Sequence, residues 1–380
     1  MKSMNINDFK RIIFKFGTNV LRNDDKEISL SRIYSFIEDI SKLHKAGKEI
    51  IIVTSGAVGL GAKKLNVDSS ESLSIKQACA AVGQSQLMSI YEDGFNKYSI
   101  NTAQVLLTED DLSNRIKYLS LNNVLNTLLG LNVIPIINQN DTVSTTELEE
   151  SGCPLYGVSF SDNDKLSALL ASKLDADLLI ILSDIDGLYD ANPKENPDAK
   201  LISEVKELTA EIEGYAQSAS KGGRGGMITK LQAAKVVTHS NGHVIIANGK
   251  QPQVIRKLFH NEKLGTTFYP VEELSQKRRW IAYATNITGQ IIINEGAKKA
   301  LLEQNKSLLS IGITKINGIF DRGDVVSILD ENNKEIARGI ANYNSEDCKK
   351  IQGEHSDNIY TILGHKNYDA VITKDNIALI

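Results

Sequence analysis

One stretch decides the fold: residues 160–193, which read FSDNDKLSALLASKLDADLLIILSDIDGLYDANP. Its polar cluster Asp162–Asp164 suits a helix start, because Asp and Asn side chains accept hydrogen bonds from the free N–H groups of a first turn. Leucines then recur at helical spacing, at Leu166, Leu169, Leu170 and Leu174. The run Leu178–Leu182 is apolar on both faces, which is typical of a buried parallel strand, and it ends in Ser183-Asp184. We therefore predict a helix followed by a strand, with polar side chains at the helix start and at the strand end.

The chain on both sides of this stretch repeats the same alternation. Further strands are expected at 11–16, 49–54, 102–107, 133–137 and 243–247. Helices are expected at 29–46, 74–96, 115–129 and from the glycine-rich segment 221–230 to about residue 240. Repeated strand–helix units predict an α/β fold, an open and mostly parallel sheet sandwiched by helices. Ligands of such sheets bind at the carboxyl ends of the strands.

The pattern changes near Pro270. Short alternating stretches follow, separated by turn signals at Asn317-Gly318, Arg322-Gly323 and Asn332-Asn333, with one short helix expected at Glu295–Gln304. Such spacing predicts a small, mostly-β barrel. We expect two domains, residues 1–270 and 277–380, joined by a linker at about 269–276.

Composition excludes several classes of protein. Lys and Arg total 43 against 47 Asp and Glu, a net charge of −4, so affinity of the whole chain for nucleic acid or anionic membranes is not indicated. The three cysteines are odd in number and lack C-x-x-C spacing, which favours reduced thiols over a disulfide framework or a zinc site. Residues 1–10 do not resemble a signal peptide, and no apolar run is long enough to span a membrane. A soluble cytoplasmic protein is expected.

Two local features point to anion chemistry, and each has a plainer alternative. Lys15 interrupts an apolar strand and would be costly to bury without an anionic partner; the alternative is an edge-strand lysine that faces water. The glycines of 222–226 would let backbone N–H groups approach phosphate oxygens at a helix start. That segment is not a Walker A loop, and the alternative is a flexible surface loop. Ser55-Gly56 could likewise be only a tight strand–helix turn.

Taken in order, several motifs carry a resemblance. They are FKFGTN (14–19), VTSGA (53–57), AVGQ (81–84), INQND (137–141), DND (162–164), Ser-Asp (183–184) followed by Gly-Leu-Tyr (187–189), and GGMITK (225–230). Along essentially its whole length the chain resembles the amino acid kinase family, and within it the glutamate 5-kinases. The C-terminal part resembles a PUA domain through Trp280, Gly296, Gly312, Gly318, Gly323 and Tyr343-Asn344-Ser345.

The resemblance implies transfer of the ATP γ-phosphoryl group to the side-chain carboxylate of L-glutamate, the first step of proline biosynthesis, with proline as feedback inhibitor. It implies that Lys15 and Lys230 neutralise the transferring phosphoryl group and that Asp164 holds both lysines. By the same implication, Ser55, Asp141 and Asn163 bind glutamate, with Asn163 donating to a carboxylate. ATP would be bordered by Lys15, Gly17, Ser183, Asp184, Arg224, Gly225, Gly226, Met227, Ile228, Thr229 and Lys230, with Gly17 and Gly225-Gly226 giving backbone N–H donors. Mg²⁺ would be coordinated mainly by the oxygens of the nucleotide, so no metal-ligating residues are assigned.

The chemistry fits these residues. A glutamate side chain, with a pKa near ~4.3, is ionised at neutral pH and needs no general base to become a nucleophile. The site must then supply positive charge and alignment, on which phosphoryl transfer mainly depends.

The chain departs from the family's pattern in one region. The connection from Asp141 to Asp162 is longer than usual, Ser161 replaces a usual glycine and Gln139 a usual glutamate. The strength of proline inhibition is therefore left open, as is the ligand of the PUA domain.

Two other functions are possible readings of the same sequence. One is another amino acid kinase, acting on aspartate, acetylglutamate or a nucleoside monophosphate. The other is an RNA-binding protein with a vestigial kinase domain, for which Lys277-Arg278-Arg279 and Trp280 offer only a small basic footprint. A homo-oligomer is expected, without a defined number of subunits.

Overall fold

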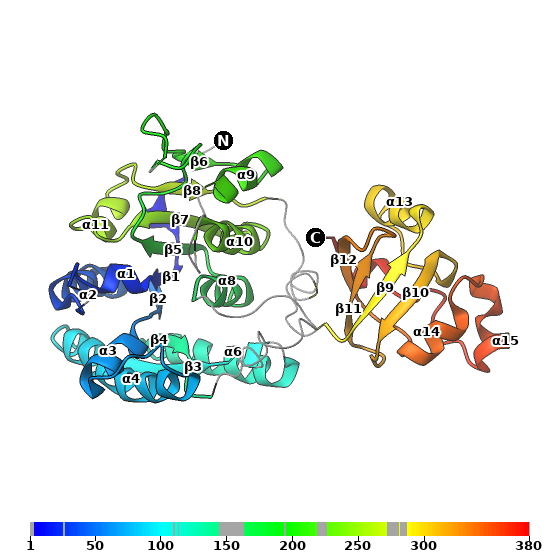
Figure 1. Ribbon diagram of the computed structural model, residues 1–380, viewed down its shortest axis with the longest axis horizontal. Coiled ribbons are helices and arrows are strands. Elements are labelled where there is room, and N and C mark those ends of the chain that lie inside the picture. Colours follow the sequence, from blue (N-terminus) through cyan, green and yellow to red (C-terminus); the bar gives the residue numbers. More distant parts are fainter. Residues whose placement is uncertain are drawn as a thin grey trace. The chain divides into compact units, whose positions relative to one another are not determined.

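An eight-stranded sheet runs through the first part of the chain in the order β3-β4-β2-β1-β5-β7-β8-β6 (Figure 1). In sequence order its strands are Arg11–Phe16, Glu49–Val53, Thr102–Leu107, Ile134–Gln139, Leu178–Ser183, Glu204–Val205, His243–Asn248 and Thr266–Phe268 (β1 to β8). Neighbouring strands from β3 to β7 are parallel, whereas β8 is antiparallel to β7. The expected mostly parallel sheet is therefore confirmed, with one reversal near an edge.

The computed structural model describes residues 4–25, 27–108, 111–112, 114–143, 163–193, 195–218, 226–271, 281 and 287–379. It divides into two compact units, residues 1–273 and 274–380. Each unit is described by itself.

Helices cover both faces of the large sheet. They are α1 (Thr18–Leu21), α2 (Leu30–Lys45), α3 (Ala57–Leu65), α4 (Leu73–Asn96), α6 (Arg115–Gly130), α8 (Asn163–Lys173), α9 (Ala210–Ser218), α10 (Met227–Thr238) and α11 (Val254–Phe259). In Figure 1, α2 and α11 lie on one side of the sheet, and α8 and α10 on the other. A short 3-10 helix at Ile6–Asp8 precedes β1. Each helix predicted for this unit is present, with ends that differ by a few residues.

From residue 163 on, the deciding stretch folds as expected. Helix α8 begins at Asn163, and every residue of β5 is buried. Strand β1 lies between β2 and β5, so Lys15 is on a central strand and the edge-strand alternative is wrong. The carboxyl ends of β4, β2, β1 and β5 lie side by side and together form one edge of the sheet.

Helices α3 and α4 approach each other so closely that only glycine fits between them. A Cβ atom at Gly83 of α4 would lie 1.8 Å from the Ala57 carbonyl oxygen of α3, and one at Gly61 would lie 1.8 Å from the Cys79 carbonyl oxygen. Both obstacles are backbone atoms, which cannot rotate away. The helix pair is therefore fixed in position, and with it the start of α3.

We expect Gly83→Ala to destabilise the protein by at least ~1–3 kcal/mol, because the added methyl group forces the two helix backbones apart. Gly214→Ala is the matched control: it also lies within a helix, with no atom in the way, so stability should stay the same or rise by about 0.5–1 kcal/mol. Thermal unfolding measures both. Equal melting temperatures for the two variants would contradict the close helix contact.

The second unit has its own five-stranded sheet, in the order β10-β9-β11-β12-β13. Its strands are Gly289–Ile293, Ile313–Gly318, Val325–Leu329, Glu335–Ile340 and Ile377–Leu379 (β9 to β13). Short 3-10 helices lie at Ser310–Gly312, Ser356–Asn358 and Lys374–Asn376. A separate apolar core that includes Ile291, Val326 and Tyr343 packs inside this unit.

The turns predicted for the second unit are confirmed. Its helices were predicted only in part. Gly318, Gly323 and Asn333 all adopt positive φ, as turn residues do. Helix α13 spans Glu295–Gln304 as predicted. Two further helices, α14 (Ser345–Ile351) and α15 (Ile359–Leu363), were not foreseen, since each is too short to show a helical period.

The structure describes only some of the residues on which the remaining sequence predictions depend. Trp280, the basic triplet 277–279 and linker positions 272–276 lie outside the described residues. Cys79 and Cys348 are free and buried, and burial raises the pKa of the Cys348 thiol to about 12. Across the described ranges, no helix has the length and apolar character needed to cross a membrane.

Candidate active site

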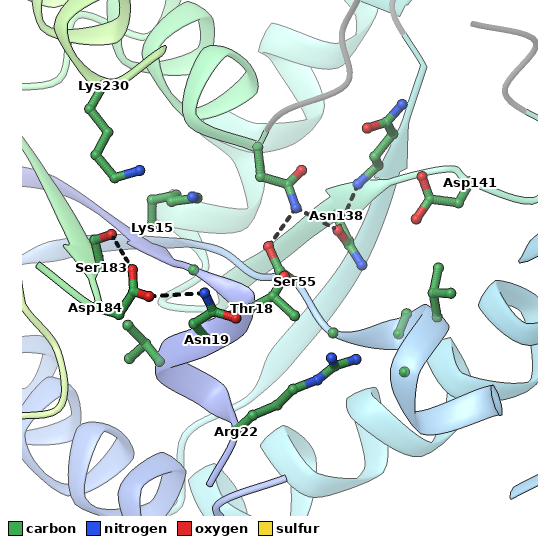
Figure 2. A pocket seen from close by; sticks show the side chains of 18 of the residues that line it. Lys15, Thr18, Asn19, Arg22, Ser55, Asn138, Asp141, Ser183, Asp184 and Lys230 are labelled. Atoms are coloured by element: carbon green, nitrogen blue, oxygen red, sulfur yellow. Dashed lines mark hydrogen bonds between the residues drawn. The ribbon is translucent and has the colours of Figure 1, made fainter. Parts of the chain in front are cut away.

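A cavity of about 400 Å³ opens at the joint carboxyl ends of four strands (Figure 2). Lys15 and Gly17 come from β1 and the turn after it, Ser55 follows β2, and Asn138 is the next-to-last residue of β4. Ser183 ends β5 and Asp184 follows it, Asn163 begins α8 and Lys230 lies in the first turn of α10. The edge of the sheet at which ligands of α/β folds bind is thus the edge at which polar side chains gather.

Two lysines share one carboxylate in the wall of this cavity. The Asp164 Oδ1 atom is 2.5 Å from Lys15 Nζ, and its Oδ2 atom is 3.1 Å from Lys230 Nζ. The Thr229 hydroxyl also donates to Asp164 Oδ2, at 3.1 Å. All three charged side chains are at least nine-tenths buried. The structure brings together the three residues that were expected to act as a unit.

The pKa of the Asp164 carboxyl is set by two opposed effects. Burial raises it, and the ammonium groups of Lys15 and Lys230 lower it more, so the pKa lies below its usual range. Two buried ammonium groups line the cavity here, and the Asp184 carboxylate at the rim offsets part of the charge of Lys230. A wall that carries two such groups favours an anionic ligand.

Asn163 is oriented by neighbours from two other strands. Its amide nitrogen donates to the Thr54 carbonyl oxygen and to Ser55 Oγ, both at 2.8 Å, and approaches Asn138 Oδ1 at 3.2 Å. The Thr54 carbonyl fixes which way the amide faces, because an oxygen placed there would face another acceptor. The buried Asn163 Oδ1 has no partner among the described residues. Donation by Asn163 to a ligand was expected; the geometry instead leaves an acceptor.

Gly17 also differs from its expected role as a phosphate donor. Its N–H donates to the Leu182 carbonyl oxygen at 3.0 Å, which extends the β1–β5 ladder by one bond. A Cβ atom at this position would lie 3.3 Å from that same oxygen. Gly17 therefore lets β1 stay close to β5 as the chain turns into α1, and its N–H is already used.

Asp184 is held at another part of the cavity rim. Asn19 donates to its Oδ2 at 2.9 Å, and Ser183 Oγ to its Oδ1 at 3.2 Å (Figure 2). Burial raises the pKa of the Asp184 carboxyl, and the hydrogen bonds from Asn19, its own backbone and Ser183 lower it more, so the pKa is depressed. An ionised carboxylate of fixed orientation results.

Of the remaining predicted site residues, some lie on α10 or in the cavity wall and others lie outside the described residues. Gly226 is the N-cap of α10, and Met227, Ile228 and Thr229 form its first turn with Lys230. Asp141 lines the cavity beyond the end of β4. Arg224, Gly225 and Asp162 lie outside the described residues. Among the cavity residues without a predicted role are the polar or charged residues Thr18, Asn19, Arg22, Lys76, Asn138 and Gln139. Asn138 follows a predicted strand and could have been found that way, whereas Arg22 carries no such signal.

Comparison with known proteins identifies the family. The model of the amino acid kinase family matches residues 10–248, and that of the PUA domain matches residues 289–363. A glutamate 5-kinase from Thermoanaerobacter sp. (strain X514) is 44% identical over 373 residues, covering 97% of this chain and 98% of the relative. The chain belongs to the glutamate 5-kinase group of the amino acid kinase family.

Other members and a distant fold neighbour agree with this placement. The glutamate 5-kinase of Methanosarcina barkeri (strain Fusaro / DSM 804) is 45% identical over 385 residues, covering 99% of this chain and 98% of its own. The solved carbamate kinase from Giardia lamblia bound to AMP-PNP is 19% identical, with a TM-score of 0.50, and covers 70% of this chain and 100% of its own. That likeness concerns the fold alone. As a kinase of this family, the protein uses ATP.

Proposed function

We propose that the protein transfers the γ-phosphoryl group of ATP to the side-chain carboxylate of L-glutamate, forming L-glutamyl 5-phosphate. The observation that carries the proposal is the buried Lys15–Asp164–Lys230 cluster, which lines one cavity together with Ser55, Asp141 and Asn163. The near full-length similarity to proteins named glutamate 5-kinase supports the choice of substrate.

The residues can supply what the reaction needs. The attacking carboxylate is ionised at neutral pH, so no general base is required. Lys15 and Lys230 bring two positive charges toward the phosphoryl group, and Asp164 holds their side chains in place without neutralising both. Magnesium, when bound, would be carried by the triphosphate oxygens and would neutralise part of their charge.

Acceptors in the cavity suit the α-ammonium group of an amino acid. Asp141 offers a carboxylate, and the buried Asn163 Oδ1 offers an amide oxygen that no described residue uses. An ammonium donor would satisfy that oxygen and so offset the cost of leaving it unpaired. In this proposal, glutamate lies across the cavity with its side-chain carboxylate toward the two lysines.

Glutamate-dependent ADP release tests the function, together with trapping of the acyl phosphate by hydroxylamine. Aspartate, acetylglutamate and UMP serve as the alternative acceptors. Turnover with one of these and none with glutamate would replace the proposed substrate. A role in proline biosynthesis with feedback inhibition belongs to the same proposal, and adding proline to the assay tests the inhibition.

We expect Asp141→Asn to raise the KM for glutamate at least about tenfold while the KM for ATP changes little, because a charge-assisted bond to the ammonium group is worth roughly 1.5–3 kcal/mol. Initial rates at varied glutamate and varied ATP separate the two effects. Asp68→Asn is a suitable control, since that carboxylate is exposed and lies outside the cavity. Equal increases in both KM values would remove Asp141 from the amino-acid site.

We also propose that residues 1–270 form the kinase domain and residues 277–380 the PUA domain. We expect a fragment of residues 1–270 to fold and to phosphorylate glutamate, because each unit has its own apolar core. Thermal unfolding and ADP release measure this. A fragment ending at 248 is the control and should not fold stably, because it lacks β8 and α11. Four residues of α11 belong to the apolar core of the first unit: Val254, Ile255, Leu258 and Phe259. An inactive or insoluble 1–270 fragment would contradict the division.

A further inference from the structure

Arg22 places a positive charge in the cavity that the proposed roles of the other residues do not use. It directly follows α1 and lines the same cavity as the two lysines. Its backbone is fixed on two sides, by a β-bridge to Ile28 and by Arg32 Nη1, which donates to the Arg22 carbonyl oxygen at 3.0 Å. No carboxylate within the described ranges forms an ion pair with its guanidinium.

The position of the guanidinium depends on a glycine. A Cβ atom at Gly59 would lie 1.5 Å from Arg22 Nη2 and 2.6 Å from Arg22 Cζ, so the guanidinium fills the space that a side chain at 59 would take. Gly59 lies in the first turn of α3, which has no side-chain cap. The free N–H groups at that helix start add positive potential beside the guanidinium. An anionic group placed here would meet both.

This positive charge is separate from that of the two lysines. Figure 2 shows the Arg22 guanidinium pointing away from Lys15 and Lys230, toward the side of the cavity on which α3 lies, while Asp141 lies at the far side from the lysines. Besides Lys15 and Lys230, the cavity is lined by two basic residues, Arg22 and Lys76, and by the acidic Asp141. Of the two basic side chains, the Arg22 guanidinium is the one that fills the space beside Gly59 at the start of α3. The α-carbon of a free amino acid carries one negative and one positive group, which complement Arg22 and Asp141.

We infer that Arg22 binds the α-carboxylate of the amino-acid substrate and so makes the site selective for an acidic α-amino acid over acids that lack this carboxylate. The inference rests on the proposed function and adds a specificity-determining residue to it. A guanidinium suits a carboxylate because its planar N–H groups can donate two parallel bonds. A substrate without the carboxylate would leave the guanidinium unpaired in the cavity wall.

The decisive comparison uses L-glutamate and its α-amide, which keeps the side-chain carboxylate and the ammonium group but lacks the α-carboxylate. We expect wild-type protein to prefer glutamate in kcat/KM. Arg22→Met should lower this preference about 10- to 100-fold, mainly through the KM for glutamate, while the KM for ATP stays unchanged. Arg22→Lys should restore part of it, because the charge returns without the planar fork. Arg322→Met, the same change at an exposed arginine of the second unit, should leave the preference as it was.

A second variant moves the guanidinium without removing it. Gly59→Ala places a methyl group where Arg22 Nη2 lies, and the flexible arginine can swing aside, so the helix should keep its fold. We expect Gly59→Ala to lower the preference for glutamate in the wild-type background and to cause no further reduction in the Arg22→Met background. Such non-additivity would tie the effect of residue 59 to Arg22.

The outcomes separate the inference from the function on which it rests. No phosphorylation of glutamate by wild-type protein would overturn the proposed function itself. Glutamate turnover with an unchanged preference in Arg22→Met, or in Gly59→Ala if the first variant does not fold, would overturn the inference alone. A raised KM for ATP with the preference intact would place Arg22 on a phosphate group and would also overturn it.

Discussion

We expect Lys230→Met to lower kcat by about 10²–10³-fold, the effect typical of removing one preorganised charged donor from a transition state. Lys230 is buried beside Asp164 and lines the cavity, so its ammonium group can face the transferring phosphoryl group. Methionine has a similar length and no charge, which keeps the packing while removing the electrostatic term. Single-turnover phosphorylation of glutamate at saturating ATP measures the chemical step directly.

Lys235→Met is the matched control for this variant. Lys235 lies on the same helix, α10, but is half-exposed and pairs with Glu213 at 3.3 Å. Surface pairs of this kind contribute little, so both turnover and stability should stay close to wild type. Near-normal single-turnover rates in folded Lys230→Met would exclude Lys230 from the chemical step.

A second large effect is expected from Asp164→Asn, which we predict to cost about 3–5 kcal/mol of stability. The substitution keeps the shape of the side chain but removes the carboxylate that pairs with both buried ammonium groups, those of Lys15 and Lys230. Acid should have the same effect in the wild type. The Asp164 pKa is lowered in the folded protein, so its contribution is present at neutral pH and is lost as pH falls through that depressed pKa. Urea unfolding at neutral pH gives the free energy of unfolding.

Glu38→Gln offers a close control, because Glu38 also lies between two cations, Lys42 at 2.5 Å and Arg256 at 3.2 Å, but at the surface. Its loss should cost no more than about 1 kcal/mol. Adding Lys15→Met to Asp164→Asn should recover part of the lost stability, because it removes one uncompensated charge. An Asp164→Asn variant as stable as Glu38→Gln would mean that the two lysines do not depend on Asp164.

Much of this architecture follows from local sequence. The apolar run of β5, the Asn163 start of α8 and the strand–helix alternation are properties of neighbouring residues, and so they could be read from the sequence. Helix α13 and the turns at Gly318 and Gly323 could be predicted from the sequence for the same reason. The ordered motifs indicated the family, which the full-length comparisons confirmed.

Short or competing signals were harder to read. Helices α14 and α15 were missed, since so few residues show no period. The family resemblance implied that the Gly17 N–H binds phosphate, but a backbone N–H can also continue a strand ladder, and here it does. For Asn163, the side chain both donates and accepts, and only its neighbours Thr54 and Ser55 decide which atom remains for a ligand.

The sequence by itself determined which elements form, in what order, and which polar side chains stand at their ends. Tertiary structure alone decided which of those side chains meet. Lys15, Asp164 and Lys230 are far apart in the chain. The two lysines share the Asp164 carboxylate only because β1 lies beside β5 and α8 packs against α10. Arg22 reaches the cavity only because Gly59 leaves room for it. Periodicity and capping act between near neighbours, whereas contacts across a sheet depend on strand order and on the space that distant residues leave free.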